Sequence, residues 1–333
     1  MELINKEIQK FLTAHLGTAE FERLAIKKGG SDRRFFRVCL PDKTSFIFMH
    51  FGTDVAENSH WAGINDFLAG LNIAVPQIFA LDAARHFILL EDLGDVDLWS
   101  QRDLPWDVRR GYYYQVLRQI RNLHAFDLYR IPSRLKLAEG YGKKLYRWEH
   151  QYFQENFVEA VCRLYLPPSE QKDLKRELEG LITRLQKTAP ALIHRDFQSQ
   201  NILIKDGRTA LIDFQGMRKG CLFYDLGSLI CDPYVAFADK ERNELLIFYH
   251  DLMKPACSYD EFIGNFWEAA AQRLMQALGA YGFLGLKKKK TDFLRHIDNG
   301  ASNLLTAATH AANLPELRKL AGKCIRKLSQ SKH

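Results

Sequence analysis

Residues 192–214 read LIHRDFQSQNILIKDGRTALIDF, and this stretch decides the fold. Two short apolar segments, 202–205 and 209–212, flank the turn dipeptide Asp206-Gly207. Apolar segments on either side of an Asp-Gly pair are typical of two antiparallel strands joined by a tight turn. The stretch therefore predicts a β-hairpin that follows one polar loop and leads into another.

The polar residues around this hairpin have the spacing of a phosphoryl-transfer site. His194-Arg195-Asp196 is followed by Asn201, which fits the H-R-D-x-x-x-x-N catalytic loop of protein-kinase-like enzymes, and Asp213 comes directly after the hairpin. A base must accept the proton of the attacking hydroxyl while oxygen ligands hold Mg²⁺ on the phosphates. We expect Asp196 to be the base and Asn201 and Asp213 to be the metal ligands.

A plainer explanation is that these are ordinary loop residues, because Asp and Asn favour turns. Their joint occurrence at fitting offsets around a hairpin favours the catalytic interpretation.

Upstream, the sequence predicts a small α+β lobe over residues 1–92. An amphipathic N-terminal helix precedes strands near 35–40 and 45–51, a helical stretch near 55–71 and two further short strands before residue 92. A polar segment, EDLGDVD at 91–97, marks the boundary. Long helical patterns dominate from Asp107 onward, so residues 93–333 are expected to form a larger, mainly helical lobe.

Composition excludes several classes of protein. The 333 residues are 47% hydrophobic and 26% charged, which is the ordinary range of globular chains. No apolar run approaches the length of a membrane span, and the charged N-terminal segment is unlike a secretory signal. The six cysteines are scattered without a metal-like pattern, which favours reduced thiols in a cytoplasm.

The net charge of +7 is concentrated near the C-terminus. From Phe283 onward there are 11 Lys and Arg against 3 Asp and Glu, a balance of +8, so the rest of the chain carries −1. The run Lys287 to Lys290 begins this basic segment. A solvated turn and a charged helix face explain it better than nucleic-acid binding does.

The order of several motifs carries a family resemblance. A Gly-rich hairpin, LLEDLG, HRDFQSQN, IDFQ and YDLGSL follow one another over nearly the whole chain. In this order they resemble the aminoglycoside phosphotransferase/choline kinase branch of the protein-kinase-like superfamily. Within it, SDRRFFRV, YDLGSLICDPY and AAAQRLMQALGAYGFL (269–284) resemble the kinases that phosphorylate N-acetylmuramate and N-acetylglucosamine at the anomeric position in cell-wall recycling.

The resemblance implies a two-lobed α+β fold, a small mixed sheet lobe plus a larger helical lobe, with ATP and Mg²⁺ as cofactors. It implies that a small-molecule hydroxyl, most closely that of an amino sugar, is the acceptor. The nucleotide would meet a loop before the first strand of the hairpin, the following arginine and the segment between the lobes. The residues concerned are Gly29, Gly30, Ser31, Arg33, Glu91 and Leu93. Gly29-Gly30 taken alone is equally a turn. Asp225 would brace the catalytic loop, or would simply cap a helix.

Two positions depart from the superfamily pattern. One is Gln215, since DFQ stands in place of D-F-G, and the other lies in the small lobe. Such kinases place a Lys on the second long strand of the small lobe, where this chain has Met49 and His50. Arg33, Arg34 or Arg37 is then the candidate for the missing cation. The anomeric sugar kinases that this chain resembles also tend to lack this Lys, so its absence favours that subfamily as much as it suggests an inactive protein. Two alternatives stay open.

The first alternative is a kinase for another hydroxyl, such as that of an aminoglycoside or choline. The second is an inactive nucleotide-binding protein. The role of Glu57, which would pair with the absent Lys, and the oligomeric state are not fixed by the sequence.

Overall fold

Five strands form the sheet of the N-terminal lobe in the computed structural model, which describes residues 2–26, 33–52 and 56–330. In chain order the strands are β1 (Glu22–Ile26), β2 (Arg34–Cys39), β3 (Ser45–His50), β4 (Ile78–Asp82) and β5 (Phe87–Glu91). Their order in the sheet is β1-β2-β3-β5-β4, and every neighbouring pair is antiparallel. The predicted strands of this lobe are confirmed.

The pairing corrects the expectation of a mixed sheet. β3 and β4 run in the same direction, but they are not neighbours, because β5 lies between them and pairs antiparallel with both. A helical connection separates β3 from β4 along the chain: a 3₁₀ turn η1 (Ala56–His60) followed by α2 (Trp61–Gly70). The hairpin from β4 to β5 then inserts β5 beside β3.

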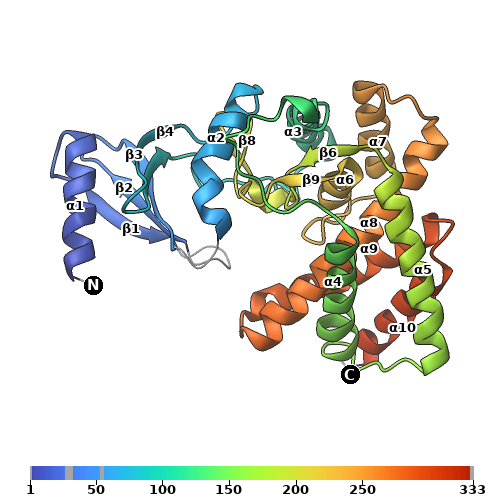
Figure 1. Cartoon of the computed structure of the whole chain (residues 1–333). Helices are drawn as coiled ribbons and strands as arrows, with labels where there is room; N and C mark the ends of the chain where they lie inside the picture. The colour runs from blue at the N-terminus through green and yellow to red at the C-terminus, as the bar shows by residue number, and fades with distance from the viewer. Residues whose placement is uncertain (1, 27–32, 53–55, 331–333) are drawn as a thin grey trace.

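The two faces of the sheet have different partners. Helix α1 (Glu2–Leu16) covers one face and places Ile8, Phe11 and Leu12 against Phe48 and Phe87 (Figure 1). On the opposite face, side chains that include Met49, Ile88 and Leu90 pack into the main core together with α2. Because successive side chains of a strand point to opposite faces, β3 and β5 are buried on both sides.

Helices make up most of the second lobe. They are α3 (Trp106–His124), α4 (Lys143–Phe153), α5 (Pro168–Lys187), α6 (Leu222–Ile230), α7 (Asp239–Met253), α8 (Tyr259–Gly282), α9 (Ile297–His310) and α10 (Pro315–Gln330). Short 3₁₀ and π segments interrupt them: η2 (Leu128–Arg130), η3 (Gln154–Glu159), η4 (Ser199–Asn201), η5 (Phe283–Lys287) and η6 (Thr291–His296). Two antiparallel ribbons complete the lobe, β6 (Pro190–Ile193) with β9 (Arg218–Cys221) and β7 (Ile202–Lys205) with β8 (Arg208–Leu211).

Helix α8 is the centre of this lobe. It is buried nearly all round from Phe266 to Gly279 and packs against α4, α6 and α9 (Figure 1). Even its polar side chains, Glu268, Gln272 and Arg273, are buried, and each has a hydrogen-bond partner in a neighbouring element. Gly227 of α6 lets the two helices approach closely, because a Cβ atom there would lie only 2.7 Å from the Cα atom of Ala270. The motifs YDLGSL and AAAQ therefore meet at one helix crossing.

The predicted hairpin is formed by β7 and β8, and it is tied to the segment that joins the lobes. Asp206 and Gly207 have φ values of 51° and 74°, the left-handed conformation that a two-residue hairpin turn needs. The amide of Leu98 donates to the carbonyl of Ile202 at 2.8 Å, and the amide of Ile204 donates to Val96 at 2.8 Å. The hairpin thus anchors the chain where it leaves the sheet.

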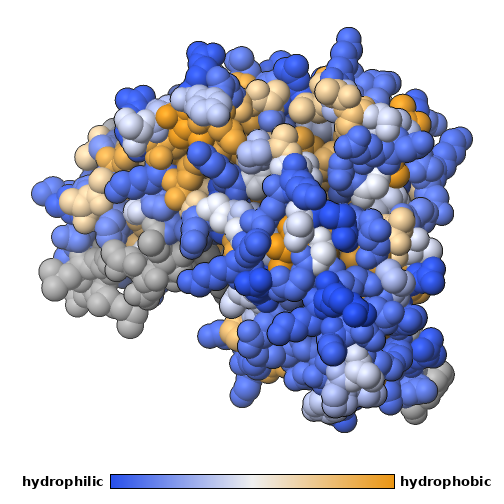
Figure 2. Space-filling model, turned by 45° about the vertical axis from the view of Figure 1, so that its right-hand side comes forward, coloured by the Kyte–Doolittle hydropathy of each residue, from blue (hydrophilic) through white to orange (hydrophobic). Residues whose placement is uncertain are grey.

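Surface character agrees with the sequence. In the part of the chain that is described, no helix is both long enough and apolar enough to cross a bilayer. Figure 2 shows one face of the molecule, whose lower half is almost entirely hydrophilic, with hydrophobic residues gathered toward the upper left.

Candidate active site between the lobes

A cleft of about 640 Å³ lies between the two lobes, and the three residues predicted for chemistry all line it. Asp196, Asn201 and Asp213 reach it from the catalytic loop, the turn before β7 and the loop after β8. The small lobe contributes Arg33 and the apolar side chain of Ile47. The cleft therefore joins the predicted base, the predicted metal ligands and predicted nucleotide contacts, of which Arg33 comes from the small lobe.

The catalytic loop is held in place by a buried carboxylate. Asp225 is fully buried and accepts hydrogen bonds from the amides of His194 at 2.6 Å and Arg195 at 2.8 Å. Arg195 has a φ of 77°, a conformation that is unfavourable for a residue with a side chain. Two hydrogen bonds to a charged acceptor offset such strain. The bracing role of Asp225 implied by the resemblance is the one that these contacts describe.

Two arginines flank the carboxylate of Asp196. Nη1 of Arg195 lies 3.5 Å from Oδ2, and Nη2 of Arg273 lies 3.7 Å from Oδ1. The side chain of Asp196 is 27% exposed and faces the cleft, so a hydroxyl can reach it. Its main-chain carbonyl accepts a hydrogen bond from Nδ2 of Asn201 at 2.8 Å. This hydrogen bond fixes the side-chain amide of Asn201 relative to the predicted base, Asp196.

Asp213 lies at the other side of the same loop pair. The amide of Ile212 donates to the carbonyl of Asn201 at 3.0 Å, which links the end of the hairpin to the catalytic loop. Asp213 accepts hydrogen bonds from Arg33 and, at 3.0 Å, from Nε2 of Gln215. Burial opposes ionisation, but the charge of Arg33 together with these two hydrogen bonds holds the pKa of Asp213 below its usual value.

The donor set suits a hard cation. Among the described residues no cluster of three or more His, Cys, Asp or Glu forms a metal cage. The amide oxygen of Asn201 and the carboxylate of Asp213 are nevertheless the oxygen ligands that Mg²⁺ takes when phosphates and water complete its shell. The two residues therefore fit a Mg²⁺ ion that arrives with a nucleotide.

The nucleotide contacts predicted from the sequence divide into two groups. Arg33, Glu91 and Leu93 line the cleft, while Gly29, Gly30 and Ser31 lie outside the described residues. The amide of Glu91 donates to the carbonyl of Gln77 at 2.8 Å, so that group is occupied within the sheet. A nucleotide base that enters the cleft here therefore has to contact Glu91 through an atom of Glu91 other than the amide nitrogen.

Only one of the three candidate arginines faces the predicted chemistry. Arg33 is 8% exposed and contacts Asp213, whereas Arg37 is bound by Asp92 and Asp95 in the segment between the lobes. Those two carboxylates raise the pKa of Arg37. Arg34 is exposed. Met49, at the strand position where the superfamily has a Lys, is a fully buried core residue, so no cation lies at that position.

Sequence reasoning assigned no role to several residues of the site. Arg273 and Gln215 stand inside the quoted motifs AAAQRLMQALG and IDFQ, but only as letters of a resemblance. Arg218 follows the second of these motifs. Tyr234 and Tyr281 line the far end of the cleft, from CDPY and from the end of α8. Their polarity and aromaticity were visible, but their convergence depends on how α8 packs.

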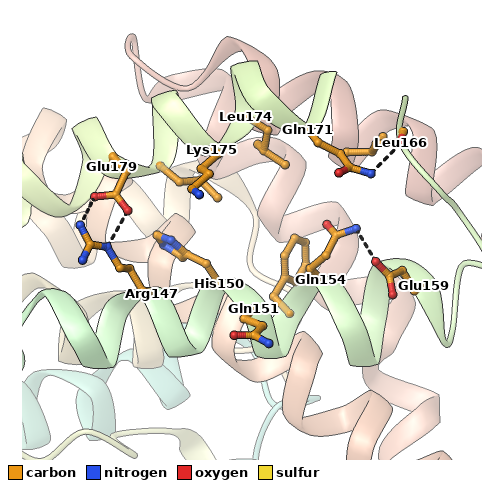
Figure 3. A pocket seen from close by; sticks show the side chains of 12 residues that line it. Arg147, His150, Gln151, Gln154, Glu159, Leu166, Gln171, Leu174, Lys175 and Glu179 are labelled. Atoms are coloured by element: carbon orange, nitrogen blue, oxygen red, sulfur yellow. Dashed lines mark hydrogen bonds and ion pairs between the residues drawn. The ribbon is translucent and has the colours of Figure 1, made fainter. Parts of the chain in front are cut away.

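A larger hollow, of about 800 Å³, lies between α4 and α5 (Figure 3). Its floor is apolar, and its rim carries the ion pair of Arg147 with Glu179, whose two contacts are 2.7 Å long. His150 faces it and bonds to Gln272 at 2.7 Å. None of the predicted site residues lines this hollow, so the chemistry is placed in the smaller cleft.

Residues 22–259 match the model of the phosphotransferase enzyme family. The chain belongs to this phosphotransferase family. It is 24% identical over 293 residues to an N-acetylmuramate/N-acetylglucosamine kinase of Neisseria meningitidis, covering 86% of each chain. It is 23% identical over 306 residues to the kinase of that name from Pseudomonas aeruginosa, covering 90% of this chain and 87% of the relative.

Solved structures of phosphotransferases share the fold. A choline kinase from Cryptosporidium parvum aligns with a TM-score of 0.63 at 14% identity, covering 96% of this chain and 99% of the other. An ADP-bound aminoglycoside phosphotransferase, APH(2'')-Ib, aligns with a TM-score of 0.61 at 13% identity, covering 94% and 98%. The two-lobed, protein-kinase-like fold is confirmed. As a member of this phosphotransferase family, the chain is a small-molecule kinase that acts on a hydroxyl group.

Proposed function

We propose that this kinase transfers the γ-phosphoryl group of ATP to the anomeric hydroxyl of an N-acetylated amino sugar. The observation that supports this choice of acceptor is the charge at the large-lobe end of the cleft. Among the described cleft residues from 195 onward, the carboxylates are Asp196 and Asp213, and both are assigned to the chemistry. Arg195 and Arg273 add two positive charges beside the base.

The positive charge at the large-lobe end of the cleft is unfavourable for a cationic acceptor. Aminoglycosides and choline carry positive charge, and a like charge without a free carboxylate to offset it disfavours binding. A neutral or acidic sugar meets no such penalty. The aromatic rings of Tyr234, Tyr281 and Phe293 line the same end and offer flat apolar surfaces to a sugar ring. Both relatives named above are kinases of N-acetylated amino sugars by name.

The roles follow the geometry. Asp196 orients the acceptor hydroxyl and accepts its proton, and Arg195 and Arg273 keep its carboxylate in position. Asn201 and Asp213 would hold Mg²⁺, which neutralises charge on the phosphates when it is bound. Arg33 is the cation on the small-lobe side. Because an anomeric hydroxyl is more acidic than an alkyl one, a single carboxylate base suffices for it.

Each lobe has the role that we expect from the sequence. The small lobe, residues 1–92, covers the nucleotide, and residues 93–333 carry the base and the acceptor. All six cysteines are free thiols, which supports action in the reducing cytoplasm.

A product analysis tests the proposal. The protein is incubated with Mg-ATP and with N-acetylmuramate, N-acetylglucosamine, choline or an aminoglycoside, and the product is examined by ³¹P NMR. We expect an amino-sugar product whose phosphorus couples to the anomeric proton, and no product with Asp196→Asn. Phosphorylation of choline or of the aminoglycoside instead would overturn the choice of acceptor but not the family. Nucleotide binding without turnover of any acceptor would favour the inactive alternative.

A further inference from the structure

Three side chains join the lobes at the predicted metal site. Nη1 of Arg33 donates to Oε1 of Gln215 at 2.8 Å, and Nη2 of Arg33 donates to Oδ1 of Asp213. Nε2 of Gln215 donates to the same Oδ1 at 3.0 Å. Gln215 therefore binds the arginine through its oxygen and the aspartate through its nitrogen, so the three groups form a closed ring.

This ring accounts for two departures of the sequence at once. The strand position where related kinases have a Lys is the buried Met49, and the residue after Asp213-Phe214 is Gln rather than Gly. A glycine has no side chain with which to hold an arginine. The glutamine supplies an acceptor for Arg33 that a glycine in the same place lacks.

We propose that Arg33 is the exchangeable counter-ion of Asp213, and that Gln215 positions it to become the phosphate-binding cation when nucleotide and metal enter. The inference rests on the proposed nucleotide site. Without a nucleotide, the guanidinium neutralises a carboxylate that would otherwise be left unpaired between the lobes. With a metal on Asp213, Arg33 gives up that contact and keeps Gln215.

The physical argument concerns competition for one oxygen atom. The side chain of Arg33 is 8% exposed, and a guanidinium that donates to Asp213 and Gln215 in a site of low exposure is a strong partner for a carboxylate. Oδ1 already accepts from both Arg33 and Gln215, and a divalent cation held by this carboxylate would place like charge beside the guanidinium, so the cation would favour release of Arg33. Arg33 therefore weakens metal binding to the nucleotide-free protein and strengthens binding of the negatively charged nucleotide.

Metal binding without nucleotide tests this competition. Mn²⁺ serves as the probe, and its binding to the nucleotide-free protein is measured by electron paramagnetic resonance. We expect Arg33→Met to bind Mn²⁺ about fivefold more tightly than the wild type and to bind ATP about tenfold more weakly. Arg34→Met is the matched control, since Arg34 is the exposed neighbour, and it should change neither affinity more than about twofold.

Gln215→Leu tests the positioning role. Its effect on ATP affinity should be smaller than that of Arg33→Met, and the double variant should resemble Arg33→Met alone, because Gln215 acts through Arg33. Gln215→Glu keeps an acceptor for Arg33 and should retain more ATP affinity than Gln215→Leu. Thermal unfolding of each variant confirms that it is folded.

Each failure has a distinct meaning. Unchanged Mn²⁺ affinity in Arg33→Met, or independent addition of the two substitutions, would overturn the exchange. Mn²⁺ binding that survives Asp213→Ala would instead show that the proposed metal site is misplaced, and the proposed function would need another. Neither measurement depends on knowing the acceptor.

Discussion

Glu57 of the small lobe accepts a hydrogen bond from Arg218 of the large lobe, with 3.0 Å between Oε1 and Nη2. Arg218 is 5% exposed, and its other nitrogens donate to the carbonyls of Gly216 at 2.9 Å and Glu139 at 3.3 Å. It is thus fixed in the large lobe, and its remaining nitrogen, Nη2, donates across the cleft. The Glu that would pair with a strand Lys in related kinases is here paired with an arginine of the opposite lobe.

Glu57→Gln should therefore raise the KM for ATP about five- to tenfold and lower the melting temperature only slightly, since the side chain of Glu57 is 35% exposed and glutamine keeps an oxygen that can accept from Arg218. The physical reason is that the pair sets the distance between the lobes, and the nucleotide binds between them. Initial rates at varied ATP and a thermal melt measure the two effects. Glu7→Gln is the control, because Glu7 pairs with Arg85 inside the small lobe at 3.9 Å. An equal change in both variants would contradict the role across the cleft.

Asp196→Asn should leave ATP affinity within about threefold and lower kcat by about three orders of magnitude, because its carboxylate acts on the acceptor hydroxyl and not on the nucleotide. Nucleotide titration and steady-state kinetics separate the two quantities. Turnover near the wild-type rate would remove Asp196 from the role of base.

The catalytic loop and its hairpin were predictable because they depend on neighbours in the sequence. Asp206-Gly207 fixes the turn, and Asn201 bonds to Asp196 only five residues away. The fold class was predictable for a similar reason, since strand and helix periodicities are local. The family resemblance added that motifs far apart in the sequence belong to one type of fold and one site.

The contacts between the lobes were not predictable from one sequence. Arg33 and Asp213 are 180 residues apart, and Glu57 and Arg218 are 161 apart. Nothing in the local pattern distinguishes Arg33 from its exposed neighbour Arg34. Which of the two arginines faces Asp213 depends on how the sheet packs over the catalytic loop, and this is a property of the packed core.

Glu149 gives a prediction of pH dependence. It is fully buried, and burial raises the pKa of its carboxyl although Tyr141, Tyr224 and Gln272 all donate hydrogen bonds to it. A raised pKa means that the folded state favours the protonated form. This stabilising effect is complete below the pKa of the unfolded chain, about 4.3, and is lost as pH rises through the folded pKa.

Glu149→Gln should remove this loss, so the free energy of unfolding of the variant relative to wild type should rise with pH above about 4.3, by at most about 1.4 kcal/mol per pH unit. Urea unfolding at several pH values measures the difference. Glu155→Gln, an exposed carboxylate in η3, is the control and should run parallel to the wild type. A difference that stays constant over pH would show that Glu149 is ionised in both states.

Arg273 provides the last prediction, because it joins helix α8 to the catalytic loop. Its Nη2 donates to Oε1 of Gln198 at 3.3 Å and lies 3.7 Å from the carboxylate of Asp196, while its Nε donates to Ser228 at 3.1 Å. Arg273→Met removes one of the two charges beside the base and leaves buried acceptors without a donor. We expect kcat to fall about 10- to 100-fold, ATP affinity to stay within about threefold, and stability to drop by about 1–3 kcal/mol. Arg184→Met, which breaks a 2.7 Å contact from α5 to Glu268 on α8 outside the cleft, controls for the loss of an arginine that packs against the same helix. If both variants lost stability and kcat in the same proportion, Arg273 would be a structural residue of α8 and not a positioning residue for Asp196.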